Sequence, residues 1–382
     1  MSIASLLIFV GILFSLVIIH ELGHFLFAKI MKMRVDEFAF GFPPRVWTRQ
    51  IGETKYSLNL LPIGGYVKIF GEQGLEEGEE KKLENQKDLH RSFDRKSIFA
   101  RLVVLAGGVF FNIIACVILL SVSYVFGSKV VLTPHEVASV PKEDRQLVVV
   151  SVHKESNLYA QGLREGDVLL GVRSQADALG VDNLFSEKAV EFIKNHDSEL
   201  LNLQIQKSNK EVVSYAAVPQ AGLVEGKKAL GIGLADISEK RLGIGESVIR
   251  AASDTYVYTK LFLGSFAGLV KSAFTKGENV SDSLSGPVGM AVATKDIAQK
   301  SFSDIAFFAA MISLSLAVFN ILPIPALDGG RILFVLSEIP AKMIWKRKLS
   351  KSVEQTTHAL GFLFLIGLMI FVTYFDILKL FK

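Results

Sequence analysis

Four long apolar runs dominate the pattern of hydrophobic and polar positions along the chain. They cover residues 3–28, 102–126, 305–327 and 355–375. Each is long enough to cross a hydrocarbon core, which needs about 20 predominantly apolar residues. The first run is expected to stay as a helix rather than leave as a signal peptide, because no basic segment precedes it and no small-residue cleavage site follows it. The pattern therefore predicts four membrane-spanning helices.

A short segment between the first two runs has a different pattern. Residues 56–72, YSLNLLPIGGYVKIFGE, alternate apolar and polar positions on either side of a Pro and Gly-Gly turn. This alternation predicts a β-hairpin. Irregular backbone is tolerated at membrane depth only where protein shields it from lipid. We therefore expect the hairpin to dip into the bilayer and line a protein cavity.

The region after the second run is more polar and contains shorter apolar pieces. Residues 128–236 predict a small soluble α+β domain, and residues 237–304 an amphipathic helical region whose apolar stretch is too short to cross a membrane. The predicted division of the chain is 1–31 for the first span, 32–101 for the hairpin loop, 102–127 for the second span, 128–236, 237–304, 305–336 for the third span, 337–354 for a basic loop and 355–378 for the fourth span.

Composition and charge support a membrane protein. Half of the 382 residues are hydrophobic, and the mean hydropathy is +0.39, too high for an ordinary soluble chain. The formal charge is only +4, and no basic tract indicates a nucleic-acid partner. Lys and Arg are dense at 32–101 and 341–351. The positive-inside rule places these loops in the cytoplasm, and both termini and residues 128–304 outside.

The first span contains polar side chains that are costly in hydrocarbon unless they are paired or functional. His20, Glu21 and His24 form the pattern H-E-x-x-H. On a helix the two imidazoles lie on one face, about 6 Å apart at their Cβ atoms, so both can bind one ion. The alternative is a chance match, but the setting inside a span favours a metal. Zinc with an open fourth position is the expected ion, and Glu21 is the expected general base.

The third zinc ligand is expected from Asp328, at the end of the third run. Two prolines break that run within FNILPIPALDGGR, residues 319–331. The alternative is an interfacial acid that caps the next helix. The remaining histidines are expected at the surface: His90, His135, His153, His196 and His358. The orientation places His20 and Asp328 at a similar depth, toward the cytoplasmic leaflet.

These motifs together resemble the site-2 protease family (M50), and more narrowly its bacterial regulator-of-sigma-E protease branch. The resemblance rests on HELGH, on LLPIGGYVKIFGE, on G-x-x-x-N at 108–112, on SGPVGM at 285–290 and on N-x-x-P-x-P-x-L-D-G at 320–329. It implies one Zn²⁺ per chain on His20, His24 and Asp328, with Glu21 as catalytic base. It also implies a set of substrate-binding residues: Asn112, Asn320, Leu60, Gly64, Gly65, Tyr66 and Val67. For Asn112, a plain interhelical hydrogen bond is an equal alternative.

The resemblance also implies a fold, a substrate class and a location. The fold is a polytopic α-helical membrane protein with four transmembrane helices, a membrane-associated β-hairpin and one extracytoplasmic PDZ-like α+β domain, which residues 156–175 resemble. The substrate would be a single-pass membrane protein such as an anti-sigma factor, already cleaved by an upstream site-1 protease, with remnant signal peptides as a second class. The location would be the bacterial cytoplasmic (inner) membrane.

Two other functional classes are compatible with parts of the sequence. A non-catalytic membrane scaffold would use the PDZ-like domain to hold partners, but it would need no base beside a metal, and Glu21 is present. A transporter-like metal protein would also have broken helices and ligands at membrane depth. No internal repeat or second ligand cluster in the sequence supports that class. An intramembrane zinc endopeptidase is the expected function.

Overall fold

The chain forms two compact units, Met1–Ser123 with Gly243–Lys382, and Tyr124–Leu242. The computed structural model describes residues 3–72, 89–132, 134–153, 155–207, 209–224, 227–239, 241–275, 286–297, 301–344 and 351–380. The longest stretches outside these residues are 73–88 of the predicted hairpin loop, 276–285 and 298–300 of the amphipathic region, and 345–350 of the basic loop. The predicted soluble domain at 128–236 lies within the second unit.

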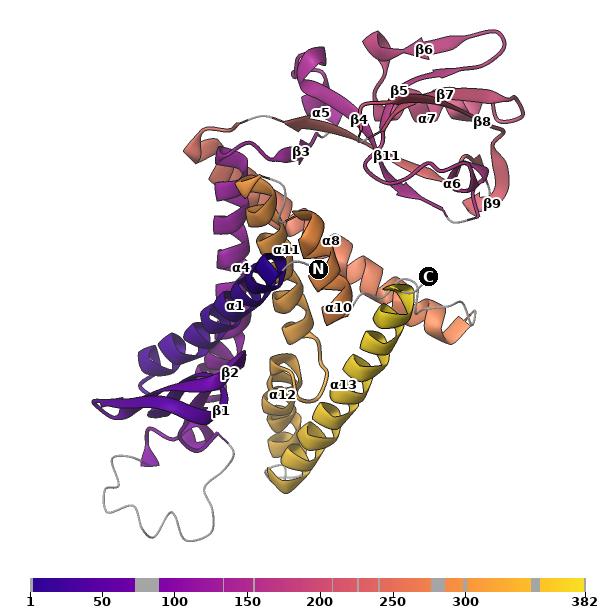
Figure 1. Cartoon of the computed structure of the whole chain (residues 1–382). Coiled ribbons are helices and arrows are strands. Elements are labelled where there is room, and N and C mark those ends of the chain that lie inside the picture. The colour runs from indigo at the N-terminus through magenta and orange to yellow at the C-terminus, as the bar shows by residue number, and fades with distance from the viewer. Residues whose placement is uncertain are drawn as a thin grey trace. The chain divides into compact units, whose positions relative to one another are not determined.

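The first unit is mostly helical (Figure 1). Its helices and strands are α1 (Ile3–Ile30), β1 (Val35–Ile51), β2 (Thr54–Ile69), a 3-10 turn (Phe93–Arg95), α4 (Ile98–Val125, which continues into the second unit), α8 (Ile244–Thr275), α10 (Pro287–Ile297), α11 (Phe302–Ile321), α12 (Asp328–Ile344) and α13 (Lys351–Leu380). Four of them, within the described residues, are long and apolar enough to cross a membrane: Ala4–Ile30, Ile98–Val125, Phe302–Ile321 and Ser352–Leu378. Each of the four predicted spans thus corresponds to a candidate membrane-spanning helix.

The third span is shorter than its apolar run. Helix α11 ends at Ile321, and the next helix, α12, begins at Asp328. The prolines at 323 and 325 explain the break, because a proline has no N–H to donate and its ring clashes with the preceding turn. Asp328 therefore begins a new helix instead of ending the third span. This is the placement expected of an acid at the start of a helix.

The small sheet of the first unit pairs differently from the predicted hairpin at 56–72. Phe38 of β1 pairs with Val67 and also with Tyr56. Both arms of the predicted hairpin therefore pair with β1, which lies between them. Direct pairing within 56–72 was a wrong prediction, since the partner strand comes from earlier in the chain. That strand was missed because Pro43 follows its first half and prolines are rare inside strands.

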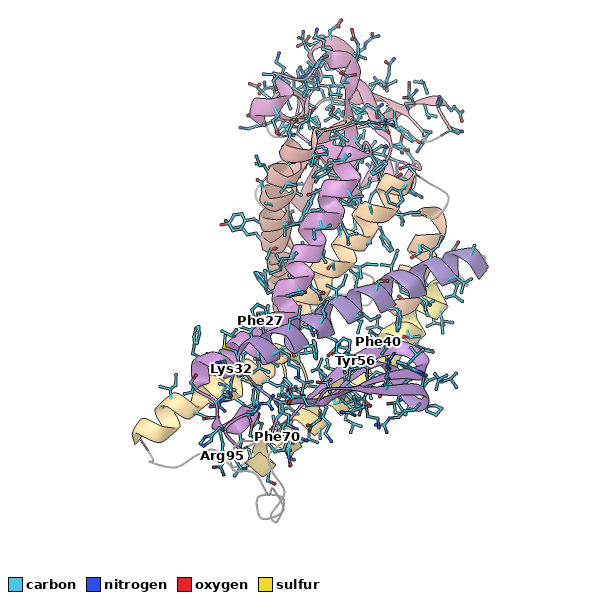
Figure 2. The ribbon with its side chains drawn as sticks, turned by 90° about the vertical axis from the view of Figure 1, so that its left-hand side faces the viewer. Phe27, Lys32, Phe40, Tyr56, Phe70 and Arg95 are labelled. Atoms are coloured by element: carbon cyan, nitrogen blue, oxygen red, sulfur yellow. The ribbon has the colours of Figure 1, made fainter. Side chains whose placement is uncertain are left out.

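Two apolar clusters hold the first unit together. One joins the end of α1, the sheet, α4 and α12, through Met33, Val35, Val104 and Val335. The other joins α1, α4, α10 and α11. Figure 2 shows Phe40 and Tyr56 on the sheet beside α1, with Phe27 on the helix itself. The sheet is thus packed against the half of α1 that carries the H-E-x-x-H motif.

The second unit is an α+β domain with its own core. Its elements are β3 (Lys129–Val131), α5 (Pro134–Val137), β4 (Arg145–Val152), α6 (Asn157–Ala160), β5 (Val168–Arg173), β6 (Ala178–Gly180), α7 (Ser186–Asn195), β7 (Leu201–Gln206), β8 (Val212–Ala217), β9 (Gln220–Val224), β10 (Lys227–Ala229) and β11 (Ile232–Glu239), with 3-10 turns at Lys142–Asp144 and Val181–Asn183. One sheet has the strand order β3-β11-β4-β5-β7-β8, with β6 paired to β5. Alternating buried residues such as Leu201, Leu203 and Ile205 face α7 in one core.

Candidate metal centre

Helix α1 brings two imidazoles together inside the protein. The Nε2 atoms of His20 and His24 lie 3.2 Å apart. Both residues are buried, at 8% and 9% exposure. This geometry follows from their spacing, since residues four apart share one face of a helix. Two ring nitrogens therefore point at one position, as the sequence predicts.

The imidazoles have room because α4 carries no side chain where they lie. A Cβ on Gly108 would be 2.5 Å from His24 Nε2 and 2.7 Å from His20 Nε2. Gly23, the residue directly before His24, lies directly against Gly107, so the two helix backbones approach closely. Small residues allow this kind of close helix packing in membranes. The glycines at 107 and 108 thus form the notch that contains the two rings.

Helix α4 also orients each ring from behind. His24 Nδ1 lies 2.9 Å from the carbonyl oxygen of Val104. A carbonyl can only accept, so Nδ1 carries the proton and Nε2 keeps its lone pair for a ligand. His20 Nδ1 lies 3.2 Å from the side-chain nitrogen of Asn112, whose own oxygen is buried and unpartnered among the described residues. A half-turn of that amide gives His20 Nδ1 an acceptor and leaves its Nε2 lone pair free as well.

Asp328 completes the group from another segment of the chain. Its Oδ2 atom lies 3.1 Å from His20 Nε2 and 3.3 Å from His24 Nε2. The ligand atoms of the three residues all lie within 4.8 Å of one another. Asp328 Oδ2 is buried without a hydrogen-bond partner in the described part of the chain. Two imidazole nitrogens and one carboxylate oxygen around one point fit a zinc site with an open fourth position.

Glu21 and the sheet lie on the same side of this group. A cavity of about 1100 Å³ is lined by Glu21, the two histidines and Asp328. A Cβ on Gly65 of β2 would lie 3.3 Å from the Glu21 side chain, so the strand passes directly beside it. Residues 65–69 pair with β1 on one edge, and their other edge has no strand partner among the described residues. An open strand edge therefore borders the site.

The structure separates the predicted substrate-binding residues into two groups. Those that line the cavity are Gly65, Tyr66, Val67, Asn112 and Asn320. Leu60 is 60% exposed and Gly64 packs beside Phe42, and neither is part of the cavity wall. The side chain of Asn112 contacts His20 directly. This contact favours a role in orienting a metal ligand over a contact with substrate.

Several site residues had not been predicted from the sequence. Arg331, one turn after Asp328, lines the cavity and forms an ion pair with Glu72 at the end of the edge strand. Val104 acts through its backbone carbonyl, so its side chain gave no signal. His358 had been expected at the surface, but its Nδ1 accepts a hydrogen bond from the backbone N–H of Ala326. Arg331 was detectable as the charged residue that follows L-D-G-G.

An ion-pair cluster fixes the far turn of the sheet to the end of α1. The carboxylate of Glu53 lies 2.6 Å from Lys29 Nζ and 2.6 Å from an Arg91 guanidinium nitrogen. The hydrogen bond from Arg91 and the contact with Lys29 lower the pKa of Glu53 to about 2, although burial opposes them. Since Lys29 lies five residues after His24, this cluster holds the sheet close to the metal ligands.

Comparison with known proteins agrees with this geometry. The family model described as "Peptidase family M50" matches residues 8–368. The chain belongs to peptidase family M50. The regulator of sigma-W protease RasP of Bacillus subtilis is 27% identical over 453 residues, covering 100% of both chains. The zinc metalloprotease RasP of Geobacillus kaustophilus is 28% identical over 450 residues, covering 100% of this chain and 99% of the relative.

A relative from Campylobacter jejuni is 31% identical over 380 residues, covering 96% of this chain and 91% of the relative. The family and these full-length relatives make the chain a zinc metalloprotease of the site-2 protease type, with zinc as its expected cofactor. With its four spans it is a multi-pass membrane protein. The resemblance seen in the sequence is confirmed at the level of family and enzyme class.

Proposed function

We propose that this M50 peptidase is an intramembrane endopeptidase that cleaves the transmembrane segment of single-pass proteins after an upstream site-1 protease has shortened them. An anti-sigma factor is the proposed substrate class, with remnant signal peptides as a second. The observation that carries the proposal is the three-ligand group, two members of which, His20 and His24, lie on a candidate membrane-spanning helix beside an open strand edge. A peptidase acting on soluble chains would not need these groups in a span.

The substrate is proposed to add a strand to the edge at 65–69. A helical segment hides its carbonyls in internal hydrogen bonds, so it must unwind before attack. Backbone pairing with an open edge replaces those hydrogen bonds at membrane depth, where unpaired groups are costly. The cavity beside this edge, about 1100 Å³, is large enough for several residues of extended chain.

The proposed chemistry assigns each residue one task. His20, His24 and Asp328 would hold the ion, and Val104 and Asn112 orient the two rings. Zinc, when bound, supplies the Lewis acidity that polarises a carbonyl and acidifies water. Glu21 takes the proton from the attacking water and returns it to the leaving amine, as a general base and then a general acid.

Glu21→Gln tests this assignment because it keeps the size and polarity of the side chain and removes the base. We expect unchanged zinc content and at least about 100-fold slower cleavage, the usual contribution of general acid–base catalysis. The matched control is Glu143→Gln, an exposed acid in the second unit. The assay is release of a labelled fragment from a tagged single-pass substrate in cells and in detergent. Turnover equal to that of the wild type would remove Glu21 from its role.

The second unit is proposed to be a PDZ-like domain that excludes substrates with large extracytoplasmic domains. Its GLREGD turn is held by Asp167, which accepts a hydrogen bond from Arg164 N and pairs with Lys207. With both termini outside and the zinc site toward the cytoplasmic leaflet of the inner membrane, this unit would meet the substrate first. The wild-type protein should cleave a shortened substrate and spare the same protein with its outer domain intact. Equal cleavage of both would reject this gating role.

A further inference from the structure

His358 of the fourth span contacts the backbone next to the third metal ligand. Its Nδ1 atom accepts a hydrogen bond of 2.8 Å from the N–H of Ala326, two residues before Asp328. Its Nε2 atom is buried and has no hydrogen-bond partner within the described residues. The ring therefore acts through Nδ1, and it joins α13 to the loop between α11 and α12.

Two internal hydrogen bonds of that loop run from Ile324 N–H to the Leu322 carbonyl and from Leu327 N–H to the Ile324 carbonyl, and neither of them involves the N–H of Ala326. Pro323 and Pro325 have no N–H groups, so they cannot donate internal hydrogen bonds. Ala326 has a φ angle of +79°, in the left-handed region that residues with a Cβ avoid. A strained residue of this kind persists only where its surroundings fix it. The hydrogen bond to His358 is such a contact, because it pairs the N–H of the strained residue itself.

A second contact from the same face of α13 supports the loop. Gly361, three residues after His358, lies directly against Pro325, and a Cβ there would be 2.6 Å from the Pro325 carbonyl oxygen. Only a glycine allows the helix backbone to come this close. His358 and Gly361 together thus form a seat for residues 325–326, one helical turn long.

These contacts matter because α13 buries little of its apolar surface against the other described elements. Only 11% of its most apolar stretch is buried within the structure, against 44% for α4 and 50% for α11. The seat on the loop is therefore one of the places where α13 is held to the rest of the first unit. Any change in that seat would be passed to Asp328, because α12 begins at that residue.

We infer that His358 is a positioning residue that holds Asp328 in place to bind zinc, acting through the backbone N–H of Ala326. The inference rests on the zinc site of the proposed function. It adds the fourth span to the elements that determine the metal geometry. No contact between His358 and the metal or the substrate is involved.

Two substitutions at His358 distinguish its two nitrogens. The side-chain oxygen of His358→Asn can take the place of Nδ1, whereas that of His358→Gln takes the place of Nε2. We expect the Asn variant to keep zinc affinity within about threefold of the wild type. The Gln variant should lose about 10-fold or more, the usual cost of removing a group that supports a metal ligand. Zinc affinity is measured on the full-length protein in detergent by competition with a chelator.

Two glycine substitutions test the same seat independently. Gly361→Ala should lower zinc affinity, because its Cβ meets Pro325. Gly367→Ala is the matched control on the same helix, since a Cβ there would meet nothing within 4 Å. Each variant is also checked for its melting temperature in detergent, so that a general loss of folding is not read as a loss of metal binding.

The outcomes separate this inference from the proposed function. The inference and the proposed function are both supported if the wild type binds zinc and His20→Ala loses it. In that case zinc binding should also be weaker in His358→Gln and Gly361→Ala, and unchanged in their matched variants His358→Asn and Gly367→Ala. Zinc bound equally by the wild type, His358→Gln and Gly361→Ala overturns the role of His358 and leaves the zinc site intact. Equal losses in His358→Asn and His358→Gln also overturn it, because Nδ1 would then not be the acting atom. A wild type that binds no zinc rejects the proposed function itself.

Discussion

Gly108→Ala adds a single methyl group to α4 at the point where the two imidazoles meet. Its Cβ would lie 2.5 Å from His24 Nε2 and 2.7 Å from His20 Nε2, whereas ordinary contacts begin at 3.4 Å. One ring or one helix must therefore move by about 0.9 Å. Ligand distances in a metal site tolerate only about 0.2 Å. We expect zinc affinity and turnover to fall by about 100-fold or more, since a 1 Å misplacement costs about that much in catalysis.

The expected effect on folding is smaller than the effect on the metal. Overpacking costs about 1–3 kcal/mol, and replacing a helical glycine by alanine returns about 0.5–1 kcal/mol. The matched control is Gly11→Ala on α1, where a Cβ would meet nothing within 4 Å. Zinc affinity by chelator competition, substrate cleavage and melting temperature are measured on both variants. If Gly108→Ala binds zinc and cleaves as the wild type does, the reasoning about the glycine notch is refuted.

Three further predictions concern the groups around the site. Asn112→Leu should lower zinc affinity about 10–100-fold, whereas Asn112→Asp should largely keep it, because the carboxylate can accept a hydrogen bond from His20 Nδ1. Equal zinc affinities of these two variants in a chelator titration would show that Asn112 does not orient His20. Arg101→Gln should destabilise the protein by about 1.5–3 kcal/mol in detergent melts, since it removes the buried guanidinium that donates hydrogen bonds to both carboxylate oxygens of the half-buried Glu338 on α12. Arg101→Met combined with Glu338→Met should cost much less. Because the folded pKa of Glu53 is about 2, below its ordinary value of 4.5, its stabilising contribution is present above pH 4.5 and is lost as the pH falls through about 2. The protection of amides at the β1–β2 turn against hydrogen exchange should therefore fall in the wild type as the pH is lowered. In Glu53→Gln this protection should not change with pH.

Local spacing explains what the sequence could predict. The relation between His20 and His24 depends only on the helical repeat, and the four spans depend only on the length of apolar runs. Asp328 was predicted as the third ligand from the proline break and the demand for one more donor. The structure brings it to 3.1 Å from His20 Nε2. The helical spacing and the apolar runs can be recognised without knowing which distant segments are in contact. Only the choice of Asp328 required an assumption about a distant contact.

The features that escaped prediction depend on contacts between distant segments. The sheet pairs Phe38 with both Val67 and Tyr56. Tertiary packing decides this arrangement, and the alternation of apolar and polar residues within 56–72 does not specify it. Val104 orients His24 through a carbonyl group that every residue type has. His358 was expected at the surface because its partner is a backbone N–H 32 positions away, on a residue whose left-handed conformation has no sequence signal.

X-ray absorption at the zinc edge of the purified full-length protein tests the central claim most directly. The account predicts one zinc per chain with two imidazole nitrogens at about 2.0–2.1 Å and one carboxylate oxygen at about 2.0–2.2 Å. Asp328→Ala should lose the oxygen ligand, and His20→Ala or His24→Ala should lose one nitrogen and most of the bound metal. A zinc shell that stays the same in all three variants would contradict the account.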